Sequence, residues 1–303
     1  MKMKQDRSAL LSGNTALFAG CLHARPDERL EDWDRFSALG RMALDFRVGS
    51  VVLTGDIADN PAAMDWNSPK RQECKRVLAD RQAGIDATAA IMSAHKEQAS
   101  KHKRQGHPER IWSPNWLIAA GNHDDKEDDI VQKDPKLEGL IGSNFLYEAW
   151  RKQGWKVWSY KRQMLNLEYP EIHGTFYGHY YPTGQMRNAA PVRTVLSQTH
   201  DSFIFSHTHD FGTAMHRGIR GCFSQAVNIG TYQPNNRLRP KNWSGAVILS
   251  EMKDGEFQIH QFSYDWIMRS YGEGGYAQEL RTARAQEHRL RRTADEAFGV
   301  AAE

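Results

Sequence analysis

Short apolar runs bounded by turn residues recur along most of this chain. They cover residues 15–19, 50–53, 116–120, 174–177 and 202–205. Their length and their β-branched and aromatic content are typical of buried strands. Between the first two runs, residues 26–47 carry apolar side chains at helical spacing, namely Leu30, Trp33, Phe36, Leu39 and Leu44. This order predicts a strand–helix–strand unit with parallel strands.

Further helices and strands are expected along the rest of the chain. Helical composition marks residues 70–103, 144–153, 187–198 and a charged stretch at 277–298, whereas residues 125–134 read as an acidic loop. Further short strands are expected within 155–182 and at 203–205, 246–250 and 257–263. The prediction is an α/β domain over residues 1–270 with a helical insertion at about 62–110, followed by a charged C-terminal helix over 271–303.

Polar motifs of a particular kind follow the apolar runs. They are Cys21-Leu22-His23, Gly55-Asp56-Ile57-Ala58-Asp59-Asn60, Gly121-Asn122-His123-Asp124, His179, and His207-Thr208-His209. In open α/β sheets, sites assemble in the crevice outside the carboxyl ends of the strands. The order of these motifs therefore predicts one site built from residues that are far apart in the sequence.

The motif order resembles the calcineurin-like metallophosphoesterase superfamily, over roughly residues 15–265. The family pattern is D-x-H, G-D-x-x-D-N, G-N-H-D/E, a lone His and G-H-T-H. This resemblance implies a four-layer α/β/β/α sandwich of two mixed sheets. The stretches Tyr177-Gly178-His179-Tyr180-Tyr181-Pro182 and Gly218-Ile219-Arg220-Gly221-Cys222 are similar to members carried by phages and prophages.

The resemblance implies two divalent metal ions, with Mn²⁺, Zn²⁺ and Fe²⁺ as the expected cofactors. The first would be held by Cys21, His23, Asp56 and His209, and the second by Asp56, Asn122, His179 and His207. Oxygen and imidazole ligands suit such ions, and a bridging carboxylate at Asp56 can hold both. The implied activity is hydrolysis of a phosphate mono- or diester by a metal-activated water.

Other residues receive roles around this centre. His123 lies outside the ligand pattern and would protonate the leaving oxygen, with Asp124 orienting it. Arg25, two residues after His23, is a candidate contact for a substrate phosphate or else a solvated loop residue. His173 competes with His179 for the role of the lone histidine, and His179 is preferred because it leads the turn after a strand.

Two positions depart from the family pattern. Cys21 stands where the first Asp is usual, and Ser206 stands where a Gly usually precedes H-T-H. A thiolate at 21 can bind Zn²⁺ or iron in preference to Mg²⁺. The alternative is that Cys21 is a small buried residue and the first metal position lacks a ligand.

Composition narrows the choice of partners and leaves alternatives open. The 40 Lys and Arg residues against 37 Asp and Glu residues give a net charge of +3, so no global charge indicates nucleic acid or a membrane. Three cysteines fit a reducing compartment, and a cytoplasmic location in a bacterium or a phage host is expected.

Basic residues within 70–104 are most simply a solvated surface, but they could favour an anionic substrate. The alternatives are a nuclease acting on DNA or RNA, and a metal-poor binding scaffold with the same fold.

Overall fold

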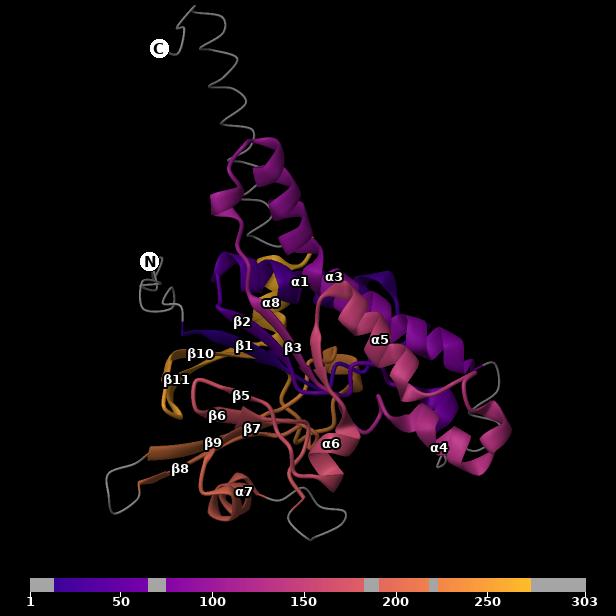
Figure 1. The fold of residues 1–303 in the computed structure, drawn as a ribbon. Coiled ribbons are helices and arrows are strands. Elements are labelled where there is room, and N and C mark those ends of the chain that lie inside the picture. Colours follow the sequence, from indigo (N-terminus) through magenta and orange to yellow (C-terminus); the bar gives the residue numbers. More distant parts are fainter. Residues whose placement is uncertain (1–13, 65–74, 183–190, 218–222, 274–303) are drawn as a thin grey trace, which may run out of the picture.

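The computed structural model describes residues 14–64, 75–182, 191–217 and 223–273. Two mixed sheets pack face to face in it, with helices on both outer sides (Figure 1). The α/β class and the four-layer arrangement predicted from the sequence are thereby confirmed.

The first sheet has six strands in the order β11-β10-β1-β2-β3-β4. Their bounds are Ala16–Ala19 (β1), Ser50–Leu53 (β2), Asn115–Ala119 (β3), Lys156–Trp158 (β4), Gly245–Lys253 (β10) and Glu256–Ser263 (β11). Strands β1 to β4 run parallel, and β10 and β11 are antiparallel to their neighbours. The parallel pairing brings the ends of β1, β2 and β3 to one edge of the sheet.

The second sheet has five strands in the order β5-β6-β7-β9-β8. Their bounds are Glu171–Ile172 (β5), Thr175–Tyr177 (β6), Ser202–Phe205 (β7), Phe211–Arg217 (β8) and Phe223–Ile229 (β9). Strands β6, β7 and β9 are parallel, while β5 and β8 form antiparallel edges. Strands β8 and β9 were not anticipated from the sequence.

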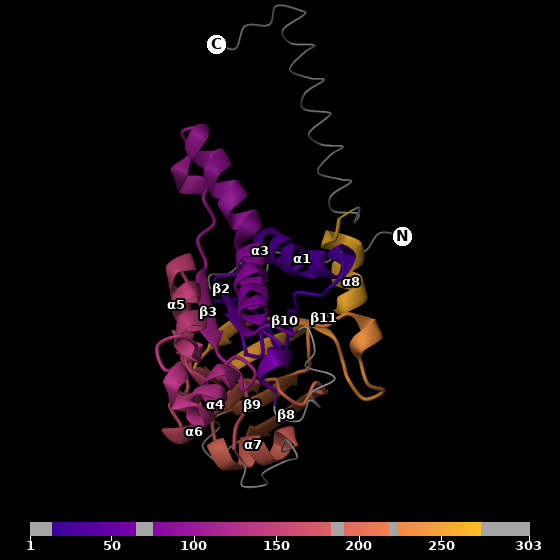
Figure 2. The same ribbon diagram turned by 90° about the vertical axis from the view of Figure 1, so that its right-hand side faces the viewer.

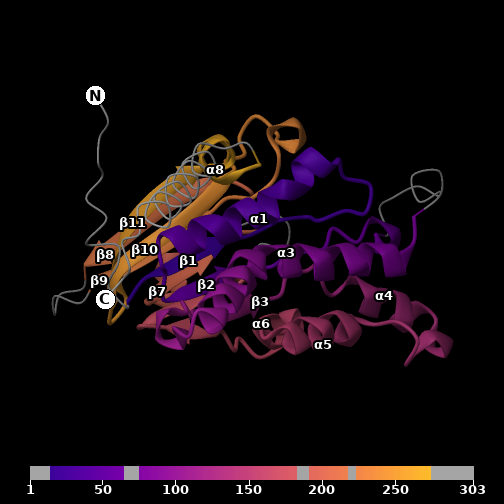
Figure 3. The ribbon, with the colours of Figure 1, turned by 90° about the horizontal axis from the view of Figure 1, so that it is seen from above.

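Helices cover the outside of both sheets. The longer ones are α1 (Leu30–Asp45), α3 (Val77–Arg104) and α5 (Ser143–Gln153), and the shorter ones are α4 (Lys126–Lys133), α6 (Tyr160–Leu165), α7 (Val192–Thr199) and α8 (Tyr264–Tyr271). Figure 2 shows α1, α3 and α8 over the first sheet and α7 below the second. Seen from above, α1 and α3 lie side by side, and α5 follows beyond α3 (Figure 3). None of the helices in the described part of the chain has the length and apolarity needed to cross a bilayer.

The alternation of side chains along the central strands fills two separate cores. Leu17 and Ala19 of β1 pack under the helices, whereas Phe18 packs between the sheets. Val51 and Val52 of β2 divide in the same way. Because both faces of these strands are buried, the strands are apolar throughout, as expected for parallel strands between two layers.

Several sequence expectations are wrong in detail. The acidic stretch 125–134 is not a loop but contains the helix α4, and α6 occupies part of the region read as strands. Leu30, placed in the apolar stripe of the first helix, is 90% exposed at the start of α1. The helix predicted at 277–298 lies outside the described residues.

Candidate metal centre

The loops after five strands meet where the two sheets adjoin. Cys21 and His23 follow β1, Asp56 follows β2, and Asn122 and His123 follow β3. From the second sheet, His179 follows β6, and His207 and His209 follow β7. The strand ends thus bring together residues as far apart in the sequence as Cys21 and His209.

Backbone strain is concentrated in these loops. Cys21, His23, Asp56, His207 and His209 all have left-handed φ angles, between 48° and 71°. Non-glycine residues seldom adopt this region, because Cβ then crowds the carbonyl oxygen. Such outliers gather at functional sites, where the surrounding structure holds them.

Glycines allow the loops to approach one another this closely. A Cβ on Gly20 would lie 2.2 Å from Thr54 Oγ1, and a Cβ on Gly121 would lie 2.2 Å from Asp56 Oδ1. Neither distance is possible for a real side chain, so only glycine fits at these two positions.

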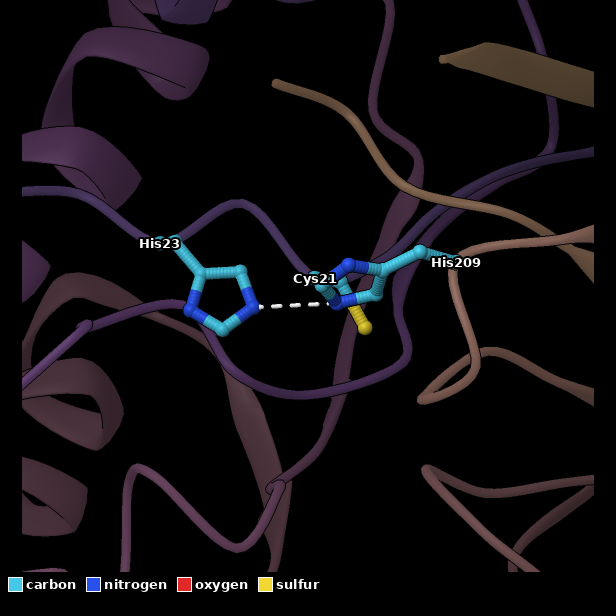
Figure 4. Close-up of side chains that lie close together, drawn as sticks. All are labelled: Cys21, His23 and His209. Atoms are coloured by element: carbon cyan, nitrogen blue, oxygen red, sulfur yellow. Dashed lines mark hydrogen bonds between the residues drawn. The ribbon is translucent and has the colours of Figure 1, made fainter. Parts of the chain in front are cut away.

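A first group consists of Cys21, His23 and His209. One potential ligand atom from each lies within 4.8 Å of the other two. The Nε2 atoms of His23 and His209 face each other at 3.2 Å, with the sulfur of Cys21 beside them (Figure 4). The side chain of Cys21 is therefore directed into the site, as its spacing from His23 suggested.

Asp59 fixes the orientation of the His23 ring. Its Oδ1 accepts a hydrogen bond from His23 Nδ1 at 2.7 Å, and its Oδ2 accepts one from Arg25 Nε. With the proton on Nδ1, the lone pair of Nε2 points into the site, as in the carboxylate–histidine pairs that support metal ligands. Burial raises the pKa of Asp59, but the hydrogen bond and charge of His23 and the charge of Arg25 outweigh it, so this pKa lies below its usual range.

The importance of Asp59 was missed in the sequence, where it was read as a turn residue. Its place in the G-D-x-x-D-N motif was the available signal. The structure also shows Arg25 engaged with Asp59, although 39% of the Arg25 side chain is exposed.

A clamp of charged groups holds the loop that carries His23. The buried carboxylate of Glu28 accepts hydrogen bonds from the backbone N–H of Arg25 and from the guanidinium groups of Arg35 and Arg237. Arg237 also donates to the carbonyl oxygen of His23, at 3.3 Å. This clamp was not predicted from the sequence, because its members are distant in the chain.

A second group surrounds the ring of His179. Its Nε2 lies 3.0 Å from Asn122 Oδ1, 2.9 Å from His207 Nδ1 and 3.2 Å from Asp56 Oδ2. Its Nδ1 donates to the carbonyl oxygen of Thr54 at 2.8 Å. The rival candidate, His173, is an exposed residue in the turn between β5 and β6 and lies outside this group.

Asp56 lies between the two groups. Its Oδ2 is 3.8 Å from His23 Nε2 and 3.2 Å from His179 Nε2, while its Oδ1 accepts the backbone N–H of His123 at 2.9 Å. Burial raises the pKa of Asp56, but the three histidines nearby outweigh that effect and hold it well below the usual range. Asp56 is thus a buried carboxylate that faces both groups, which suits a bridging ligand.

His123 and Asp124 make different contacts from each other. The Nδ1 of His123 bonds the backbone carbonyl of Asp59 at 2.8 Å, and its ring packs edge-on against that of His23. Asp124 is fully buried and accepts backbone N–H bonds from Ile57, Ala58 and Gly121, at 2.8–3.0 Å. These contacts of Asp124 join the loops after β2 and β3.

The protonation of the remaining ligands favours metal binding. Burial and the neighbouring histidines lower the pKa of His207 to about 4 and that of His209 to about 3, so both rings are neutral at pH 7. Burial and the charge of Asp56 raise the pKa of the Cys21 thiol well above its ordinary value. Ligation of this sulfur therefore requires an ion that displaces its proton.

The donor set leaves a place for a positive charge in each group. Thr54 can only accept at its carbonyl oxygen, so His179 Nδ1 carries a proton, and its Nε2 faces Asn122 Oδ1 and Asp56 Oδ2. Burial lowers the pKa of His179, but the charge and the hydrogen bond of Asp56 outweigh this effect and raise it, so the Asp56 carboxylate favours a cation, proton or metal ion, at this place. In the first group, the Nε2 atoms of His23 and His209 face each other. Lone pairs on facing nitrogens repel one another unless a proton or a metal ion lies between them.

Comparisons with known proteins give little beyond this geometry. No protein-family profile matches the chain, and no curated protein matches it. Among solved structures, the chain is similar to YfcE, a phosphoesterase from E. coli, at 12% sequence identity and a TM-score of 0.35, over 82% of this chain and 99% of that one. At this score the similarity carries no argument about activity. The relation to phage-borne members stays a prediction from the sequence.

Proposed function

We propose that the protein is a metal-dependent phosphoesterase that hydrolyses a phosphate mono- or diester at this centre. The observation that carries the proposal is the convergence of imidazole nitrogens on both sides of the buried Asp56 carboxylate. Asp56, His23, His209 and Cys21 would hold one divalent ion, and Asp56, Asn122, His179 and His207 the other. Zn²⁺, Mn²⁺ and Fe²⁺ are the ions that suit these donors.

When bound, two such ions would supply positive charge for the phosphoryl oxygens and lower the pKa of a water. In the reaction, a P–O bond to the water oxygen forms, the ester P–O bond breaks, and the leaving oxygen takes up a proton. The chain's own residues hold the ions, place the ester and deliver that proton.

His123 is the residue proposed to deliver the proton. The Asp59 carbonyl fixes its Nδ1–H, so Nε2 is the atom that takes up and releases a proton. Burial lowers the pKa of His123, which makes its protonated form a stronger acid. Asp124 is proposed to act indirectly, by joining the loops that carry Asp56 and His123. Arg25 is proposed to contact the substrate phosphate while it remains bonded to Asp59.

The basic residues near the end of α3 do not support the nuclease alternative. Asp80, in the first turn of α3, accepts the backbone N–H of Ala62 and so lies near the loop after Asp56. Lys101 is 21 residues further along the helix, which corresponds to about 30 Å at 1.5 Å per residue. The basic turn that ends α3 is therefore remote from the candidate centre.

The proposal is tested by metal removal and variant analysis. Exhaustive chelation should abolish hydrolysis of p-nitrophenyl and bis-p-nitrophenyl phosphate, and Mn²⁺, Zn²⁺ or Fe²⁺ should restore it. Asp56→Asn should lose both metals and the activity, whereas Asp80→Asn, which changes a buried aspartate outside the cluster, should keep both. Activity that persists without any metal would refute the proposal, as would a protein that binds no metal.

A further inference from the structure

The two departures from the family pattern lie together in the structure. Cys21 and Ser206 are both fully buried, and they belong to different sheets. The backbone N–H of His207, directly after Ser206, donates to the sulfur of Cys21 at 3.1 Å. The Ser206 side chain lowers the pKa of the thiol and so partly offsets the effect of burial.

Ser206 is connected to the second group as well. Its hydroxyl donates to the carbonyl oxygen of Thr54 at 2.8 Å and accepts from Thr54 Oγ1 at 3.0 Å. The same carbonyl oxygen accepts His179 Nδ1–H, and Ser206 Oγ itself lies 3.4 Å from that nitrogen. Ser206 thus lies between the two groups: the next backbone N–H, of His207, holds Cys21 of the first, and its hydroxyl contacts the residue that orients His179 of the second.

We infer that Ser206 is a positioning residue that couples the two ligand groups, through Cys21 on one side and Thr54 with His179 on the other. This inference rests on the proposed metal centre. The hydroxyl donates its one proton to the Thr54 carbonyl oxygen and accepts a hydrogen bond from Thr54 Oγ1. These two bonds fix the loop after β7, in which the next backbone N–H donates to the Cys21 sulfur.

The residues around this hydroxyl are closely packed. A Cβ on Gly20 would lie 2.6 Å from Ser206 Oγ and 2.2 Å from Thr54 Oγ1, so Gly20 already fits closely against both side chains. Removal of the hydroxyl would therefore leave Thr54 Oγ1 without this acceptor and weaken the placement of both ligands. Loss of a partner that orients a ligand typically lowers metal affinity about 10–100-fold.

The test uses Co²⁺ added to the chelated full-length protein, because a sulfur-to-cobalt charge-transfer band reports on the Cys21 position without any activity assay. Cys21→Ser should abolish this band, which would show that the band arises from the Cys21 sulfur. Ser206→Ala and Ser206→Gly should each weaken the binding of both Co²⁺ ions about 10–100-fold and shift the band. Two variants are used so that a folding defect in one does not decide the outcome.

Ser250→Ala is the matched control. Ser250 is 2% exposed, and its hydroxyl bonds His260 Nε2 at 2.8 Å within the β10–β11 pair, outside the candidate centre. This variant should bind Co²⁺ as the wild type does.

The possible outcomes separate the inference from the proposed function. Wild-type affinity and an unshifted band in both Ser206 variants would overturn the inference and leave the metal centre intact. An effect on only one Co²⁺ ion would overturn the coupling between the groups. Failure of the wild-type protein to bind Co²⁺ would overturn both the inference and the proposed centre.

Discussion

Asp59→Asn is the most informative single change near the centre, because Asp59 orients a ligand without belonging to the proposed coordination shell. Asn at this position keeps an oxygen that can accept His23 Nδ1–H. It removes the negative charge and places an amide where Oδ2 now faces Arg25. The backbone bonds of Asp59, to Ala24 and to His123, involve atoms that the substitution retains.

The size of the effect follows from these contacts. The bond to His23 is 2.7 Å long and 94% of the Asp59 surface is buried, so its carboxylate is a charge-assisted acceptor in a poorly solvated place. Charge-assisted bonds are about twice as strong as neutral ones and contribute about 1.5–3 kcal/mol. Replacement by a neutral acceptor should cost about 1–2 kcal/mol of metal binding. That corresponds to a roughly 10-fold loss of affinity, with further weakening from the displaced Arg25.

The loss should be confined to one of two ions. Asp59 bonds His23 of the first group, whereas the second group is held together by the contacts of His179 with Asn122 and His207. Metal affinities are measured by competition with a chromophoric chelator, and the content after dialysis by mass spectrometry. Asp80→Asn serves as the control, since it also neutralises a fully buried aspartate but one that accepts a backbone N–H.

Two results would refute this reasoning. Wild-type affinity for both ions in Asp59→Asn would show that the His23–Asp59 bond does not orient a ligand. Equal weakening of both ions would show that Asp59 acts on the loop as a whole and not on His23.

Three further predictions concern other residues. His123→Ala should lower turnover about 10²–10⁴-fold while both metals are retained; loss of both metals would instead make His123 a ligand. His179→Ala should empty or weaken the second metal position, as read by metal content, whereas His173→Ala, in an exposed turn, should leave both ions bound; the opposite result would exchange their roles. Asp80 has its pKa raised by burial from 3.8 to about 6, so its folded form binds the proton more tightly than its unfolded form. The stability that this provides below pH 3.8 is lost as the pH rises through 6, so the unfolding free energy of the wild type relative to Asp80→Asn should fall by about 2 kcal/mol between pH 4 and pH 7 in urea titrations; a constant difference would contradict the shift.

The strands that carry the centre could be predicted from the sequence because they are buried on both faces. The run before Gly20, for example, contains only apolar residues, so it stands out from the sequence around it. Residues of metal-ligand type directly after each run marked where the strand ends. Strands β8 and β9 were missed because β8 is an exposed edge strand, with Met215 67% exposed, and its composition does not stand out from a loop.

Contacts between distant residues could not be predicted in the same way. Periodicity indicates which face of an element is apolar, and it was right for Phe36 but wrong for Leu30 at the end of the helix. It does not indicate that Arg237 reaches the loop after His23, or that Ser206 meets Cys21, since those contacts depend on how the two sheets are docked.

The left-handed backbone at Cys21, His23, Asp56, His207 and His209 has an evolutionary consequence. Each of these conformations costs about 1 kcal/mol that glycine would avoid. Selection for folding alone would therefore favour glycine at such positions, most readily at His209, which is partly exposed. Five side chains of metal-ligand type stand there instead, which is the arrangement expected where binding outweighs the cost in stability. A laboratory screen that selects for thermostability and not for activity should therefore select substitutions in the loops around Asp56 first.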